Sequence, residues 1–135
     1  MRTMLNLRMK KHILPLACLC CLLITACKKH PMDYRNKFLG DYTFSVHFSR
    51  WQMGSGSFDT TYNSNGSVAC GNDDHSVAIA LTGGPSFDFI IYEDGSLGPA
   101  GFSIGEFESV QHVSFVWSSG GLGGGVYYAI TGERR

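Results

Sequence analysis

Short runs of alternating apolar and polar residues fill most of the chain after residue 38. The clearest run covers residues 42–50, where Tyr42, Phe44, Val46 and Phe48 alternate with polar side chains. Because successive side chains of a strand point to opposite faces, this pattern predicts a β-strand with one buried face.

Further segments continue this pattern, and turn-forming residues separate them. We expect strands over residues 58–62, 67–70, 76–81, 87–92, 101–108, 111–117 and 126–131. Asn65-Gly66 and Asp94-Gly95 are dipeptides typical of tight hairpin turns. Each of them therefore marks a predicted reversal of the chain.

The pattern as a whole predicts an all-β domain, since no stretch after residue 27 has the apolar periodicity of a long helix. Seven to eight short strands joined by tight turns are typical of such domains. We predict an antiparallel up-and-down meander that forms a small barrel or a two-sheet sandwich. The expected core comprises Phe44, Val46, Phe48, Val77, Ile79, Phe89, Ile91, Phe115 and Ile130.

Residues 1–26 differ from the rest of the chain, and we predict that they are a lipoprotein signal peptide. Basic residues precede an apolar run over residues 13–26 that is too short to span a bilayer. The run ends Leu23-Ile24-Thr25-Ala26-Cys27, which resembles the lipobox of bacterial lipoproteins. We expect cleavage before Cys27, lipidation of its thiol and anchoring in a membrane. The alternative is an ordinary secretory signal that ends beside a cysteine.

Cleavage at this point leaves a lipidated tether over residues 27–37 and a β domain over residues 38–135. The whole chain has 11 basic and 11 acidic residues, and the signal holds four of the basic ones. The mature chain therefore has 7 basic and 11 acidic residues, a net charge of −4. This balance disfavours nucleic acid as a partner, because surfaces that bind nucleic acid are basic.

Cys70 is the one cysteine that remains beside the acylated Cys27. A disulfide within the mature chain is therefore not expected. No Lys or His flanks Cys70 closely enough to argue for an activated thiolate. We interpret Cys70 as a small buried hydrophobic residue.

Two segments of the domain, FLGDYTF at 38–44 and GGLGGGVYYAITG at 120–132, resemble the opening and closing strands of a known family. The family comprises small lipocalin-like (calycin-like) lipoproteins of the Bacteroidota. The resemblance implies a β-barrel and a membrane-anchored address, and it carries over no active residues. Surface lipoproteins of that group usually have acidic residues after the acylated cysteine, whereas this chain has Lys28-Lys29-His30. We therefore expect the domain on the periplasmic side of the envelope.

The chain contains no residue pattern that predicts catalysis, a cofactor or a metal ion. The glycine-rich stretch 120–125 lacks the lysine of a phosphate-binding loop, and we interpret it as a loop or wide hairpin turn with glycines at positive φ. The cluster at 72–75 lacks the order of a calcium loop and is expected to be a solvated turn. His47 and His112 are not accompanied by a nucleophile-elbow sequence. We predict a non-enzymatic protein without a cofactor.

Aromatic residues supply most of the candidate contact positions. Trp51, Tyr92 and Trp117 can fill a core or line a contact site, and His47 lies on the polar face of the first strand. Alternation places Trp51 on that same face, so we expect it in an exposed aromatic patch at a rim of the sheet. The alternative is a β-bulge near Arg50, which would reverse the alternation and bury the indole.

Two hypotheses for function follow from this reading. The first is a membrane-anchored binding module that holds a small apolar or sugar-like ligand. The second is a structural or accessory subunit of an envelope protein complex. The inward side chains distinguish them, because an enclosed apolar cavity of about 300 Å³ or more favours the ligand and a filled interior favours the subunit.

Overall fold

The computed structural model describes residues 33–99 and 104–135, and residues Tyr34–Arg135 form one compact unit. The predicted signal peptide and the lipidation site Cys27 lie outside the described residues. The elements are η1 (Tyr34–Lys37), β1 (Gly40–Gln52), β2 (Gly56–Cys70), β3 (Ser76–Leu81), β4 (Ser86–Ile90), β5 (Ser96–Leu97), β6 (Gly105–Phe107), β7 (His112–Gly121) and β8 (Gly124–Arg134). Within the described ranges, no helix is both long enough and apolar enough to cross a bilayer.

The eight strands form one antiparallel sheet in the order β4-β3-β2-β1-β8-β7-β6-β5. A bridge between Ile91 and Leu97 joins the two ends of this sheet. Backbone hydrogen bonds support the closure, since the Tyr92 amide donates to the Ser96 carbonyl at 3.0 Å. The predicted meander is confirmed, and the structure selects the barrel over the sandwich.

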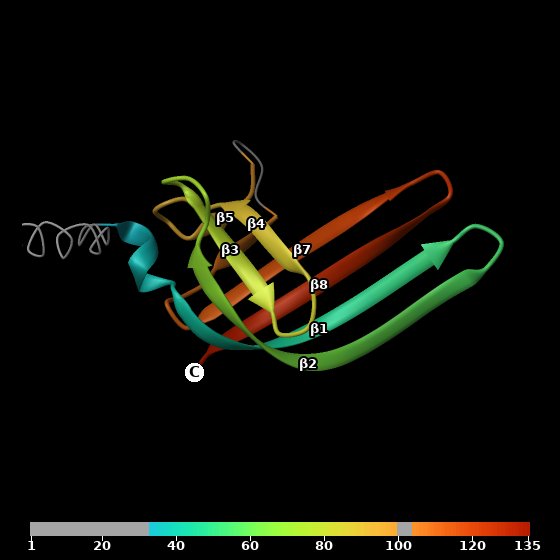
Figure 1. Cartoon of the computed structure of the whole chain (residues 1–135), viewed down its shortest axis with the longest axis horizontal. Coiled ribbons are helices and arrows are strands. Elements are labelled where there is room, and N and C mark those ends of the chain that lie inside the picture. The colour runs from blue at the N-terminus through green and yellow to red at the C-terminus, as the bar shows by residue number, and fades with distance from the viewer. Residues whose placement is uncertain (1–32, 100–103) are drawn as a thin grey trace, which may run out of the picture. The chain divides into compact units, whose positions relative to one another are not determined.

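The strands of this barrel differ greatly in length. β1, β2, β7 and β8 have 13, 15, 10 and 11 residues, whereas β3 and β4 have six and five. The hairpins β1–β2 and β7–β8 therefore extend together past the turn between β3 and β4 (Figure 1). We call these four paired strands, in the order β2-β1-β8-β7, the ribbon. In the half of the ribbon that ends in the hairpin tips, β3 and β4 do not cover the inner face.

The core fills the part of the barrel where all strands overlap. Alternation in β1 works as predicted, because Tyr42, Phe44 and Val46 are fully buried while their neighbours face solvent. Eight of the nine predicted core residues are buried. Phe48 is only partly buried, because β3 and β4 are too short to cover this position of β1.

The hairpin predicted at Asn65-Gly66 is wrong, because β2 runs through both residues without turning. Gly66 lies opposite Tyr42 in the ladder. A Cβ atom at this position would clash with the Ala80 carbonyl and lie 2.8 Å from the Phe44 ring. The glycine therefore permits the close approach of a ring and a neighbouring strand rather than a reversal of the chain.

Other predicted turns are present. Asp94-Gly95 separates β4 from β5, and Gly95 has a φ of 94°. The cluster at 72–75 is an exposed turn in which the Asp73 carboxylate accepts the His75 amide at 2.9 Å. This amide, together with Ser76, Arg35 and His75 itself, lowers the pKa of Asp73.

The folded unit begins at Tyr34, four residues before the predicted start of the β domain. The short η1 contains a buried arginine, Arg35. Its guanidinium donates to the carbonyls of Asp73 at 2.6 Å and Ser76 at 2.9 Å. These bonds attach η1 to the turn between β2 and β3.

Cys70 is exposed, which contradicts the interpretation as a buried hydrophobic residue. It is the last residue of β2 and lies opposite Val77. Val77 is fully buried, whereas Cys70 lies where the strand leaves the end of the barrel.

Candidate functional site

The four contact residues predicted from the sequence do not form one site. His47 and Trp51 share the outer face of β1, four residues apart. Trp117 lies on the inner face of β7, packed against the core. Tyr92 follows β4 at the end of the barrel remote from the hairpin tips, where its amide helps to close the sheet.

Trp51 is exposed, as predicted, with 48% of its surface accessible. The pairing of β1 with both neighbours is continuous through this position, so the structure contains no bulge at Arg50. Trp51 lies opposite Gly125 of β8, and a Cβ atom on that glycine would lie 2.8 Å from the indole Nε1. An aromatic ring over a cross-strand glycine covers backbone that the glycine leaves bare.

This contact also explains part of the glycine-rich stretch. Residues 120, 121, 124 and 125 belong to β7 and β8, and the turn itself is Leu122-Gly123. None of these glycines has a positive φ, so our prediction of glycines at positive φ in this stretch is wrong. Gly125 instead makes room for Trp51, and Gly120 lies close against Gly125.

His47 interacts with the neighbouring strand rather than with an open site. Its Nδ1 lies 3.1 Å from the Thr61 hydroxyl, and its Nε2 lies 3.4 Å from the Asp59 carboxylate. Both partners belong to β2. The imidazole thus forms a small polar cluster on the outer face of the ribbon.

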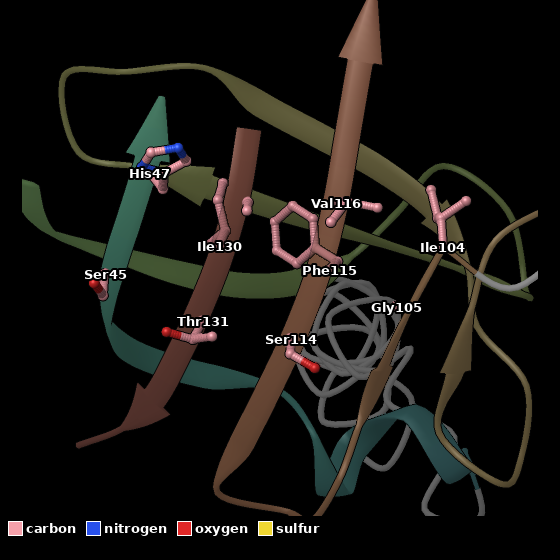
Figure 2. Close-up of a pocket in the computed structure, with 10 residues that line it drawn as sticks. Ser45, His47, Ile104, Gly105, Ser114, Phe115, Val116, Ile130 and Thr131 are labelled. Carbon is pink, nitrogen blue, oxygen red and sulfur yellow. The ribbon is translucent and has the colours of Figure 1, made fainter. Parts of the chain in front are cut away.

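A shallow cavity of about 400 Å³ lies on this outer face, beside His47. Figure 2 shows its lining residues spread over β1, β8 and β7, with Ile104 and Gly105 beyond β7. Ser45 and Thr131 place small hydroxyl groups in it. Ser114, another lining residue, already donates to Glu108 at 3.1 Å, and His47 is bound by β2. The cavity is open to solvent and has few polar groups left to orient a ligand.

The inner face of the ribbon carries a more distinctive feature, a row of aromatic rings beyond the core. We call it the aromatic platform, and it comprises Phe48, Phe58, Tyr62, Trp117 and Tyr128. Strand register places these five side chains on the same face, because Tyr62 pairs with Val46 and Tyr128 pairs with both Phe48 and Trp117. Phe58 is 52% exposed, and Tyr62 is also exposed.

The rings of the platform contact one another across all four strands. The Phe48 ring centre lies 6.2 Å from that of Phe58 and 4.9 Å from that of Tyr128. Tyr128 lies 5.9 Å from Trp117. Phe87 of β4 packs against both of these rings, at 5.5 and 5.7 Å, and marks the boundary with the core. These spacings are typical of favourable aromatic pairs.

The platform is only partly exposed to water, and the surroundings of Tyr128 illustrate this. Burial raises the pKa of Tyr128, and the nearby hydroxyl of Tyr62 adds to the shift. Tyr128 therefore keeps its phenol proton at physiological pH. The register also places Arg50 and Thr60 on this face, so polar groups border the rings.

Large aromatic side chains occupy the interior of the barrel among the described residues. Tyr42, Phe44, Phe87, Phe89 and Phe115 are all buried and several stack on one another. Three depressions lined by described residues have volumes of about 400, 230 and 290 Å³, and each opens to solvent. A ligand inside one of these three would therefore lie at the surface and not in an enclosed chamber.

One serine, one histidine and one carboxylate lie in a row near the turn between β6 and β7. The Ser109 hydroxyl lies 3.2 Å from His112 Nδ1, and His112 Nε2 lies 3.8 Å from Glu133. The Ser109 oxygen also accepts the amides of Gln111 and His112, so it caps the turn. Because these amides bond to the serine itself, they are not free to stabilise an oxyanion. This row is a turn motif.

Of the residues that the structure describes, no group of three or more His, Cys, Asp or Glu is placed to hold a metal ion. Comparisons with protein families, with curated proteins and with solved structures find no match.

Four platform residues, Phe48, Phe58, Tyr62 and Tyr128, were not among the predicted contact positions. Alternation correctly placed Phe58 and Tyr62 on one face. Their exposure depends on how far β1 and β2 extend past β3 and β4, which the predicted turn at Asn65-Gly66 concealed.

Proposed function

We propose that the protein is a non-enzymatic, lipid-anchored binding module of the cell envelope, and that its ligand lies on the aromatic platform. One observation carries the proposal: a row of aromatic rings lies beside the core, and two of its members, Phe58 and Tyr62, remain exposed. Fully burying one such side chain is worth roughly 1.5–3 kcal/mol. A ligand that covers these two exposed rings would recover part of this free energy.

The chemistry of the platform favours a small apolar or sugar-like ligand. Ring faces stack against the apolar faces of sugars or against hydrocarbon. The hydroxyls of Tyr62 and Tyr128 and the side chains of Arg50 and Thr60 border the rings and can bond to hydroxyl groups of a sugar. The inner face of the ribbon has no carboxylate between Phe44 and the hairpin tips among the described residues. Asp59 points to the outer face, beside His47.

Anchoring rests on the N-terminal sequence, with its basic start, its apolar run and Leu23-Ile24-Thr25-Ala26-Cys27. Mass spectrometry of the native N-terminus tests it directly. We expect a mature chain that starts at a triacylated Cys27. A start at another residue, or an unmodified Cys27, would contradict the anchor.

Ligand binding is tested by the fluorescence of Trp117 in a Trp51→Phe background, where Trp117 is the one remaining tryptophan. The probes are neutral oligosaccharides and the apolar dye N-phenyl-1-naphthylamine. We expect saturable binding that Phe58→Ser combined with Tyr62→Ser weakens roughly tenfold or more. Val116→Ser removes an exposed apolar side chain from the outer face and should leave Kd unchanged.

The second candidate is an accessory subunit of an envelope complex, and the filled core favours it. Absence of binding to every probe, together with recovery of one stoichiometric partner protein by crosslinking from the platform, would support the subunit. Binding that is equally strong in the platform variant would show that the ligand lies elsewhere.

A further inference from the structure

The two long hairpins end in adjacent tips that expose aliphatic side chains. Leu122 at the tip of β7–β8 is 99% exposed, and Met53 at the tip of β1–β2 is 78% exposed. The tips are held together, because the Met53 amide donates to the Gly123 carbonyl at 3.1 Å. Pairing of β1 with β8 continues to this end, where Gln52 lies opposite Gly124. The two hairpin tips therefore lie together at one end of the ribbon and form a shared apex (Figure 1).

Charged residues are absent from this apex. No Asp, Glu, Lys or Arg occurs from residue 113 to 132 or from residue 51 to 58. The first charges behind the tips are Arg50 and Asp59. Most other charges belong to η1, to the turns at the opposite end and to the last three residues. The compact unit thus has one charged end and one uncharged end.

Half-exposed aromatic rings lie a short way behind the apex. Trp51 and Tyr127 lie on the outer face of the ribbon, and Phe58 of the platform lies on the inner face. Rings on both faces therefore surround the ribbon just below its tips. In membrane proteins, amphipathic rings such as Trp and Tyr are enriched at the level of the lipid headgroups.

From this arrangement we propose that the joined hairpin tips enter the interface of a lipid bilayer. Leu122 and Met53 reach the boundary between headgroups and acyl chains, and the rings behind them lie among the headgroups. The depth is limited to about 5–10 Å, because the polar backbone of the turns cannot enter hydrocarbon unpaired. Arg50 can extend its guanidinium back toward water. This contact is independent of ligand binding on the platform.

A fluid lipid surface fits the apex better than a protein partner does. The apex offers two exposed aliphatic side chains, and residues 51–58 and 113–132 supply no charged residue to select a partner. Residues 34–135 contain 5 basic and 10 acidic residues, so attraction to anionic lipid does not drive the contact. Binding should therefore occur on neutral lipid and be insensitive to salt.

The test uses the full chain in vesicles of phosphatidylcholine with brominated acyl chains. In a Trp117→Phe background, Trp51 is the one remaining tryptophan. We expect bromine near the headgroup end of the acyl chain to quench Trp51 most strongly. The double variant with Met53→Ser and Leu122→Ser should bind the vesicles roughly tenfold more weakly, as measured by this quenching. Quenching should persist in 1 M NaCl.

Val110→Ser is the matched control, because Val110 is a 47% exposed aliphatic residue at the charged end of the barrel. It should leave the quenching of Trp51 unchanged. The proposal is overturned if Trp51 is not quenched or if the double variant is quenched equally. It is also overturned if quenching requires anionic lipid, or if crosslinking shows the tips bound to a second copy of the chain. Ligand binding by the same double variant should be normal, which separates this result from the platform.

Discussion

At the scale of residues, several strand glycines of this protein lie against aromatic rings. Phe44 lies between Gly66 of β2 and Gly132 of β8, and a Cβ atom on either glycine would press into its ring. Trp51 and Gly125 repeat the arrangement on the outer face. These glycines allow rings to lie flat against the sheet, which explains their presence in strands that they would otherwise weaken.

Gly125→Ala should therefore displace the Trp51 indole. We expect a loss of about 1–2 kcal/mol in the free energy of unfolding, as for other overpacked sites. Urea denaturation followed by Trp51 fluorescence measures it. Gly123→Ala is the control, since a Cβ there meets nothing within 4 Å and should change stability by less than about 0.5 kcal/mol. Equal effects of the two changes would contradict the contact.

Tyr42 makes stability sensitive to alkaline pH. It is fully buried and donates to the Phe38 carbonyl at 2.9 Å. Burial raises the pKa of Tyr42, and the positive charge of Arg134 only partly opposes this. The unfolded chain therefore releases this proton first, near pH 10. Stability is complete below that pH and falls as pH rises toward the folded pKa.

Tyr42→Phe should cost about 1 kcal/mol at pH 7, because one buried hydrogen bond is lost. The same variant should lose less stability than the parent between pH 9 and 11. Denaturation midpoints measured across this range show the difference. Parallel curves for the two proteins would mean that another group causes the alkaline loss.

Sequence reasoning at this scale succeeded for Trp51 and failed for Cys70. Exposure of Trp51 follows from alternation alone, because the strand keeps its period up to that residue. Exposure of Cys70 depends on where β2 passes the end of the barrel, which no local pattern records. Asn65-Gly66 is typical of turns, but here Gly66 is required by the close approach of the distant Phe44 and Ala80.

At the scale of elements, η1 contacts the barrel through several side chains, of which Arg35 is the buried one. The positions predicted as tether include Arg35, whose guanidinium binds two backbone carbonyls beside the turn between β2 and β3. The Arg35 guanidinium is buried, and these hydrogen bonds to carbonyls offset part of the cost of removing its charge from water. Sequence patterns do not detect such an element, since it has one turn and no periodicity.

Arg35→Ala should lower the free energy of unfolding by about 2 kcal/mol, because charged hydrogen bonds are lost and carbonyls remain buried. Thermal denaturation measures the loss. Lys37→Ala is the matched control within η1, since its amine lies at the surface and donates to the Glu93 carbonyl at 3.1 Å. A change of less than about 0.5 kcal/mol in both variants would show that η1 does not support the barrel.

The pattern predicted the type of nearly every strand but not the lengths of the long ones. The core residues follow from alternation, and eight of nine are buried as expected. The platform could not be predicted, because it arises from a difference in strand length: β1 and β2 are much longer than β3 and β4. Such a difference becomes visible once the strands are paired.

At the scale of the whole molecule, the first and last strands are neighbours. Tyr42 pairs with Arg134, and the Arg135 amide donates to the Asp41 carbonyl at 3.0 Å. A short Gly-Ser linker from Arg135 to Tyr34 should therefore permit new ends between Leu122 and Gly123. We expect this circular permutant to fold with stability within about 2 kcal/mol of the parent.

A second permutant with new ends between Asn65 and Gly66 is the control. The sequence alone predicts that cut in a turn, whereas the structure has it in the middle of β2. We expect this permutant not to fold, as judged by circular dichroism and amide exchange. A stable fold from it would contradict the continuous β2 strand.

The pairing of β1 with β8 also has a consequence for the order of events in time. A ribosome releases β1 first and β8 last, so nearly the whole domain must be synthesised before one edge of β1 finds its partner. Until then that edge is open to pairing with other chains, which is a known route to aggregation. The nascent protein is thus least prone to aggregation when a chaperone keeps it extended until the eleven-residue strand β8 is available.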